Sequence, residues 1–170
     1  MTDRMLMQIA NLAEDGMWSD VVELLRDNAS AIRSSSRVLS VLANYAGSKE
    51  CIEFALSLGA DANGTHAGED GPLFVCILGG SNHGLQTTPE LKTLLQGGAD
   101  PDLIGLSGMP PLHWAVYYNR LDHAEVLLEF GADTDALDAD GYSLVDISSD
   151  GSAAAKEFVK RIAKSTSSGS

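Results

Sequence analysis

The chain has 170 residues, of which 44% are apolar, so it can form a hydrophobic core; its formal net charge at pH 7 is −13. Between Glu50 and Asp150, 17 acidic residues are accompanied by only two basic ones, Lys92 and Arg120. This excess of negative charge argues against a nucleic-acid partner, whose phosphates it would repel. It favours either a solvated surface or a protein partner with a basic surface, which long-range attraction would steer into contact.

The two cysteines, Cys51 and Cys76, lie in apolar stretches with helical spacing and form no CxxC pair, so we expect buried, reduced thiols. The segment Met1–Ala13 has polar residues inside its apolar pattern and lacks the continuous apolar core of a signal peptide. No apolar run approaches the roughly 18 residues of a membrane span. We therefore expect a cytoplasmic protein with no membrane partner.

The tripeptide Gly-Ala-Asp occurs three times, at Gly59–Asp61, Gly98–Asp100 and Gly131–Asp133. The second interval is 33 residues and the first is 39, which is the same period with six residues added. Each copy follows a helical pattern that ends in adjacent apolar residues. The pattern predicts a repeated unit of two helices, which cannot bury both of its faces and must pack on its neighbours.

Between the last two copies the sequence Gly-Met-Pro-Pro-Leu-His-Trp-Ala spans 108–115. It resembles the signature of the ankyrin-repeat family, Thr-Pro-Leu-His-x-Ala on a 33-residue period. A degraded copy follows at Gly141–Val145 and a looser one precedes at Pro72–Cys76. The resemblance covers about residues 1–164 and is specific from 37 to 146.

The resemblance implies an all-α fold, an ankyrin-repeat solenoid of stacked helix-turn-helix units joined by β-turn fingers. We expect one domain of five units followed by a polar, disordered tail. The unit boundaries are about 2–33, 34–66, 67–104, 105–137 and 138–164, and the tail is 165–170. The two end units are atypical because each has one face without a neighbour.

Two groups of residues are expected to maintain this fold. Gly59, Gly98 and Gly131 should end helices in the left-handed conformation. Pro111, Leu112 and His113 belong to the signature, in which the histidine is structural and bonds to the signature threonine. Pro110 stands in place of that threonine here, so one hydroxyl partner is missing.

No motif favours catalysis, a metal or a cofactor. His66, His83 and His123 show no metal-ligand spacing with one another or with the cysteines. The acidic stretch 133–141 resembles a calcium loop, but Ala136 and Ile147 fall where an EF-hand needs ligands. The glycine-rich segment 79–84 lacks Walker A spacing and is expected to be an exposed loop, within 79–88, that could contact a partner. We therefore expect a protein that is not an enzyme.

In ankyrin stacks the fingers and the inner helices line a concave surface. Mapping the units onto one another predicts a tyrosine-rich apolar strip there, which favours binding but equally suits packing between units. The predicted contact residues are Tyr45, Leu78, Leu106, Met109, Tyr117, Tyr118, Asp138, Asp140 and Tyr142.

The leading hypothesis is a monomeric module that binds a protein partner in this groove. In its sharper form it is an inhibitor or immunity-type protein that masks a basic surface. One alternative is a scaffold that bridges two partners, through the groove and through the convex face or the 79–88 loop. The least favoured alternative is a hydrolytic enzyme that uses Asp and His.

Overall fold

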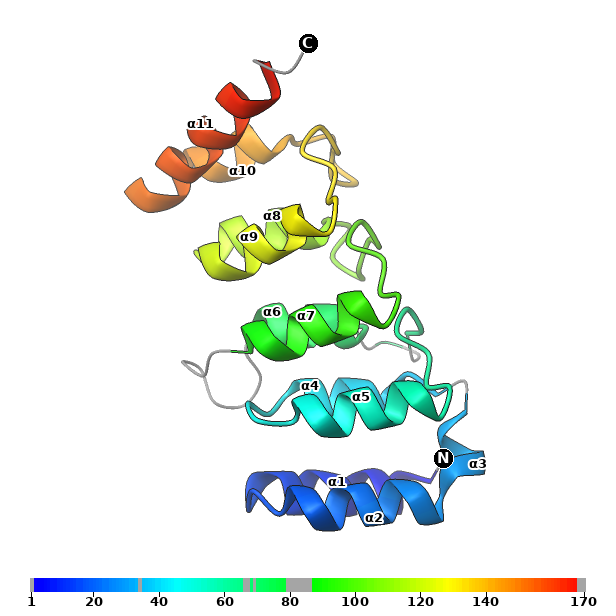
Figure 1. Ribbon diagram of the computed structural model, residues 1–170. Helices are drawn as coiled ribbons and strands as arrows, with labels where there is room; N and C mark the ends of the chain where they lie inside the picture. Colours follow the sequence, from blue (N-terminus) through cyan, green and yellow to red (C-terminus); the bar gives the residue numbers. More distant parts are fainter. Residues whose placement is uncertain (1, 34, 66–67, 69, 79–86, 168–170) are drawn as a thin grey trace. The chain divides into compact units, whose positions relative to one another are not determined.

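The computed structural model describes residues 2–33, 35–65, 68, 70–78 and 87–167 (Figure 1). Residues 79–86, which make up most of the loop expected at 79–88, lie outside the described residues, as do His66 and the last three residues of the tail. The chain divides into two compact units, Met1–Asp100 and Pro101–Ser170, and each is described by itself.

The first unit consists of helices arranged in consecutive antiparallel pairs. Its helices are α1 (Asp3–Glu14), α2 (Trp18–Asp27), the short α3 (Ala29–Ile32), α4 (Arg37–Ala43), α5 (Lys49–Ser57), α6 (Pro72–Leu78) and α7 (Thr88–Gln96). Helices α1, α4 and α6 pack side by side and form an inner layer, whereas α2, α5 and α7 form an outer layer (Figure 1). Each pair therefore buries its apolar side chains against the next pair.

The core of the first unit follows the helical period of its sequence. In α5, for example, Cys51, Ile52 and Ala55 lie on one face and are buried. A buried carboxylate joins two pairs, because Glu90 of α7 accepts a 2.7 Å hydrogen bond from the Gly47 backbone N–H in the turn between α4 and α5. The polar turn of one pair is thus held by the outer helix of another.

The second unit repeats the arrangement with two helix pairs. Its described helices are α8 (Pro111–Tyr117), α9 (Leu121–Glu129), α10 (Leu144–Ser149) and α11 (Ala153–Ser167). The inner helices α8 and α10 pack on each other, and each also packs on the outer helix that follows it, α9 and α11 (Figure 1). The elements are helical throughout the described residues, which confirms the predicted all-α class.

The three Gly-Ala-Asp copies end α5, α7 and α9 in the same way. Their glycines, Gly59, Gly98 and Gly131, have φ values of +90°, +94° and +86°. In the last copy the Ala132 N–H donates to the Leu127 carbonyl at 3.0 Å and the Gly131 N–H donates to the Leu128 carbonyl at 3.1 Å. This is the Schellman pattern, which needs a left-handed residue and so favours glycine.

Side chains within these turns tie successive repeats together. In the first unit Asn63 donates to the Gly98 carbonyl at 2.9 Å and accepts from the Asp100 N–H at 2.7 Å. In the second unit Asp102 accepts a 2.8 Å bond from the Asp133 N–H. Hydrogen bonds therefore join the turn of one repeat to the turn of the next, just as the helices of successive repeats pack on each other.

No helix of the described residues combines the length and the apolar character that a membrane crossing requires.

Replacing Gly131 with valine is expected to destabilise the protein by about 1–3 kcal/mol, because a β-branched residue resists the left-handed conformation. A Cβ added at this position would have no atom within 4 Å, so the cost comes from the backbone alone. Thermal or urea unfolding measures it. Gly131→Asn is the control and should cost less, since Asn119 already adopts a φ of +56° in this chain. Equal stability of the valine variant and the wild type would contradict the role of this turn.

Candidate partner-binding surface

The fingers of the second unit are short hairpins that lie side by side. Leu137 and Ser143 form an antiparallel bridge, and the Asp138 N–H donates to the Tyr142 carbonyl at 3.0 Å. The Ala139 N–H donates to the Gly108 carbonyl of the preceding finger at 2.8 Å. A Cβ at Gly108 would come within 2.6 Å of the Ala139 Cβ, so glycine is required where the two fingers meet.

Three aromatic side chains of α8 and its C-cap form a cluster, which we name the aromatic cluster: Trp114, Tyr117 and Tyr118. The Trp114 and Tyr118 rings stack with centroids 5.1 Å apart, and Tyr117 meets Tyr118 edge-on at 5.1 Å. The Trp114 indole N–H donates to the Ser107 hydroxyl at 2.6 Å, so the cluster adjoins the finger that carries Ser107. Although their rings contact one another, Tyr117 and Tyr118 keep 60% and 47% of their surface exposed.

The fingers add exposed apolar side chains beside the aromatic cluster. Leu106 and Tyr142, both predicted contact residues, are 62% and 55% exposed, whereas Met109 is half-buried. Two further finger residues, Ile104 and Leu137, are also exposed. Of the large apolar side chains that the structure describes as exposed, most belong to the second unit. Groups of exposed apolar side chains are typical of contact surfaces.

Trp114 is a member of the cluster that the sequence analysis does not include among the contact residues, because it lies inside the family signature. Its helical spacing is a usable signal: it precedes Tyr118 by four residues, which places both side chains on one face of a helix.

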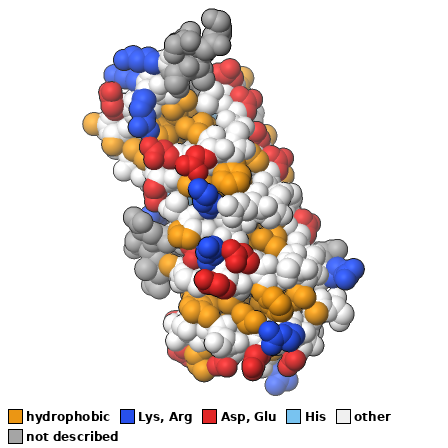
Figure 2. Space-filling view, viewed as in Figure 1, with side chains coloured by type: hydrophobic (Ala, Val, Ile, Leu, Met, Phe, Trp, Pro, Cys, Tyr) orange, Lys and Arg blue, Asp and Glu red, His pale blue; other side chains and the backbone are white. Residues whose placement is uncertain are grey.

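The predicted acidic residues of the finger have different roles. Asp138 is half-buried, and its Oδ1 accepts the backbone N–H groups of Asp140 and Tyr142 at 3.0 and 2.8 Å. It therefore shapes the hairpin. Asp140 is exposed, and its carboxylate faces solvent. The fingers of the second unit lie at the right-hand edge in Figure 1. Figure 2, in the same view, shows acidic and hydrophobic side chains alternating along that edge.

The inner layer of the first unit also forms a groove, with a volume of about 470 Å³. Tyr45, a predicted contact residue, lines it and is half-buried; Leu78 is half-buried at the end of α6 and is not among the lining residues. The residues that line the groove come from α1, α4 and α6: Asp3, Leu6, Met7, Ala10, Arg37, Ser40, Val41, Asn44, Tyr45 and Val75. Arg37 and Asp3 form a 2.7 Å ion pair there.

Met7 is the most exposed apolar residue among the groove residues that were not predicted from the sequence. It is 66% exposed on α1, in the degenerate first repeat where no signature residue guides the mapping. Its apolar character at an otherwise polar helix position is the signal that could have revealed it.

The signature residues Pro111, Leu112 and His113 are buried at the start of α8. The His113 Nε2 lies 3.3 Å from the Tyr142 carbonyl oxygen, which can only accept, so Nε2 carries the proton. Nδ1 is then an acceptor, and it is buried without a partner. This matches the loss of the signature threonine at Pro110. Burial lowers the pKa of His113 below its ordinary value, which keeps the imidazole neutral at neutral pH.

The two thiols are buried and free. Burial, with a smaller contribution from Glu50, raises the pKa of Cys51 to about 11, and burial also raises the pKa of Cys76 well above its ordinary value. Both stay protonated at neutral pH, so neither suits a nucleophile or a metal-binding thiolate. Among the described residues no group of three or more His, Cys, Asp or Glu side chains could hold a metal ion.

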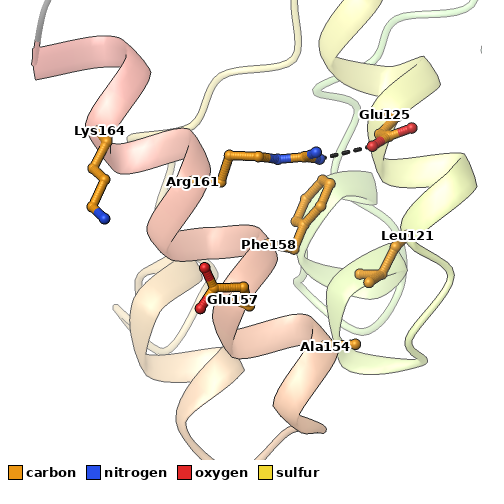
Figure 3. A pocket seen from close by; sticks show the side chains of 7 residues that line it. All are labelled: Leu121, Glu125, Ala154, Glu157, Phe158, Arg161 and Lys164. Atoms are coloured by element: carbon orange, nitrogen blue, oxygen red, sulfur yellow. Dashed lines mark hydrogen bonds and ion pairs between the residues drawn. The ribbon is translucent and has the colours of Figure 1, made fainter.

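A separate hollow of about 730 Å³ lies between the outer helices α9 and α11 (Figure 3). Leu121, Ala154 and Phe158 form its apolar part. Arg161 crosses it, with its guanidinium 5.2 Å from the centre of the Phe158 ring and 2.7 Å from the Glu125 carboxylate. This hollow is in the outer layer and so is distinct from the aromatic cluster.

Helix pairs closed by glycine turns and joined through hairpin fingers define a helical repeat protein. A family model of ankyrin repeats, in three copies, matches residues 39–138, which is more than half of the chain. The chain therefore belongs to the ankyrin-repeat family. Ankyrin repeats generally mediate protein–protein interactions and are typically not enzymes. No curated protein matches the chain.

Pro110→Thr is expected to be more stable than Pro110→Val by about 1–2 kcal/mol. The threonine hydroxyl can donate to the unpartnered His113 Nδ1 and accept a backbone N–H at the start of α8, whereas valine has the same shape without a hydroxyl. Pro110 has a φ of −62° and a ψ of 153°, which threonine adopts without strain. Urea unfolding of the two variants gives the comparison, and equal stabilities would show that the missing hydroxyl has no effect.

Proposed function

We propose that this ankyrin-repeat protein binds a protein partner through the aromatic cluster and the adjoining fingers of its second unit. The observation that supports this most is that Tyr117 and Tyr118 are exposed while their rings hold each other in place. Such side chains offer a large contact area and lose little conformational freedom on binding. A partner would displace water from rings that are already ordered.

The charge of the protein supports a partner with a basic surface. The fingers carry exposed carboxylates such as Asp135 and Asp140 beside the apolar residues, and the whole chain has a net charge of −13. Opposite charge accelerates encounter and helps to select the partner. In this proposal the protein acts in the cytoplasm as an inhibitor or immunity-type protein that covers a cationic site, and it binds neither nucleic acid nor membranes.

The scaffold hypothesis has one observation in its favour, the hollow between α9 and α11 (Figure 3). It lies in the outer layer and combines apolar residues with Arg161, so a second partner could occupy it while the first contacts the aromatic cluster. The hydrolase hypothesis has no such support, because His113 is buried against the Tyr142 carbonyl and both thiols are held protonated.

Replacing both Tyr117 and Tyr118 with alanine is expected to weaken partner binding by tenfold or more, as loss of hot-spot residues does. Stability should fall by only about 1 kcal/mol, because both side chains are largely exposed. Affinity capture from cells that naturally produce the protein, compared by quantitative mass spectrometry, measures the binding. Thermal unfolding measures the stability.

The matched control for this experiment is Met17→Ala, which removes an exposed apolar side chain of the first unit. It should retain every captured protein. If the tyrosine variant captures the same proteins in the same amounts as the wild type, the aromatic cluster is not the binding site. If the tyrosine variant unfolds, the two rings belong to the core.

Asp135→Asn/Asp140→Asn is expected to slow association with the partner and to reduce the dependence of its rate on salt. Neither carboxylate accepts a bond that shapes the finger, in contrast to Asp138, so the fold should be preserved. Stopped-flow or surface-plasmon measurements at several ionic strengths give the rates. Glu14→Gln/Asp15→Asn removes the same charge from the first unit and serves as the control. Identical rates for both pairs would exclude a local role of the finger acids.

A further inference from the structure

The two inner helices of the second unit, α8 and α10, differ in how far their side chains are buried. Three side chains of α8 are buried, whereas the side chains 33 residues later on α10 are exposed. The pairs are Leu112 and Val145, His113 and Asp146, and Val116 and Ser149. Helix α10 packs on α8, and the positions of α10 that correspond to the buried side chains of α8 are exposed among the described residues. Two of the three positions have become polar, as in an end repeat, but Val145 remains apolar and 60% exposed.

Helix α11 extends this uncovered surface, which we name the C-terminal face. Val145, Val159 and Ile162 line a hollow of about 210 Å³ on it. By its helical spacing Lys156 lies on the same side of α11 as Val159 and away from the Arg161 side that faces α9, whereas Lys160 lies between these two sides, at the outer rim. Both lysines are exposed. The C-terminal face therefore has the exposed Val145 at its centre, over the buried Val159 and Ile162. Lys156 and Lys160 lie on its outer helix, Asp146 lies on its inner helix, and Asp135 of the finger lines the same hollow.

The first repeat has the opposite surface, which we name the N-terminal face. Its hollow of about 430 Å³ is lined only by residues of α1 and α2: Gln8, Asn11, Leu12, Asp20, Glu23, Leu24 and Asp27. On α2 these residues lie on the side turned away from the buried Val21 and Leu25. Leu12 and Leu24 are half-buried, and the acids Asp20, Glu23 and Asp27 surround them. Arg4, one turn before Gln8, places a basic side chain at the start of the inner helix.

We infer that the C-terminal face of one copy binds the N-terminal face of a second copy, head to tail. If the copies stack as consecutive repeats do, inner helix on inner helix and outer on outer, the charges match in both layers. Lys156 and Lys160 of α11 meet the three acids of α2, and Asp146 of α10 meets Arg4 of α1. Val145 meets the apolar pair Leu12 and Leu24.

The lysines and acids of the outer helices are available for this contact, whereas Asp146 also accepts hydrogen bonds from the Ser143 backbone N–H and hydroxyl in the capping box of α10. None of the two lysines and three acids takes part in an ion pair within the part of the chain that the structure describes. Exposed ion pairs contribute little individually, so the apolar centre provides most of the affinity and the charges set the register. A head-to-tail contact leaves both ends open, so association produces chains of copies whose length grows with concentration. This association differs from the monomer expected from the sequence.

Sedimentation velocity of the purified protein, from about 10 µM to about 1 mM, tests the inference over the range in which weak contacts form. The weight-average mass of the wild type should rise with concentration. Lys156→Glu/Lys160→Glu should remain monomeric, as should Asp20→Lys/Glu23→Lys. Mixing these two variants should restore association, because the altered faces are complementary to each other. Val145→Asp should also remain monomeric.

Two controls keep the test specific. Lys49→Glu/Lys92→Glu makes the same change in net charge on α5 and α7 and should associate as the wild type does. Tyr117→Ala/Tyr118→Ala should also associate, so a failure of the proposed partner-binding surface is distinguishable from a failure of this inference. Thermal unfolding verifies that each variant is folded. A wild type that stays monomeric at every concentration, or an association that survives both charge reversals, would overturn the inference.

Discussion

A pair of short helices can bury only one of its two faces within itself, and the whole structure depends on this constraint. The inner helices of these repeats are six or seven residues long from α4 onwards, too short to be stable alone. Within each unit they persist because neighbouring pairs cover one another's apolar side chains. Leu112 illustrates this: it is fully buried in α8, which packs against both α9 and α10.

The proposed binding surface follows from the same constraint. Once one side of an inner helix is used for packing, the side next to the fingers stays exposed, and its residues are released from the needs of the core. Trp114, Tyr117 and Tyr118 occupy that side of α8, and the hydrogen bond from Trp114 to Ser107 fixes the finger against them. In this proposal one face of the short helix α8 provides stability and another face provides recognition.

The sequence predicted the turns well because their requirement is local. A helix that ends in a left-handed residue needs glycine whatever its surroundings, and Gly59, Gly98 and Gly131 all have positive φ. The predicted family and the all-α class, which rest on the same local patterns, are also confirmed.

The candidate surface was harder to predict from the sequence, because the exposure of a residue depends on which neighbour covers it. Asp138 and Asp140 look alike in the sequence, yet only the three-dimensional hairpin makes one of them an acceptor for two backbone N–H groups. Val145 likewise resembles a core residue in the sequence, yet the structure leaves it exposed.

The two cysteines have a practical consequence for how the protein opens. Both lie in the first unit, at Cys51 and Cys76, and the second unit has none. A thiol is modified only after it is exposed and ionised, and burial opposes both steps here. Alkylation by a thiol reagent therefore reports transient unfolding of the first three repeats alone. The chain thus contains a natural probe that follows the opening of one half of the molecule without any engineered label.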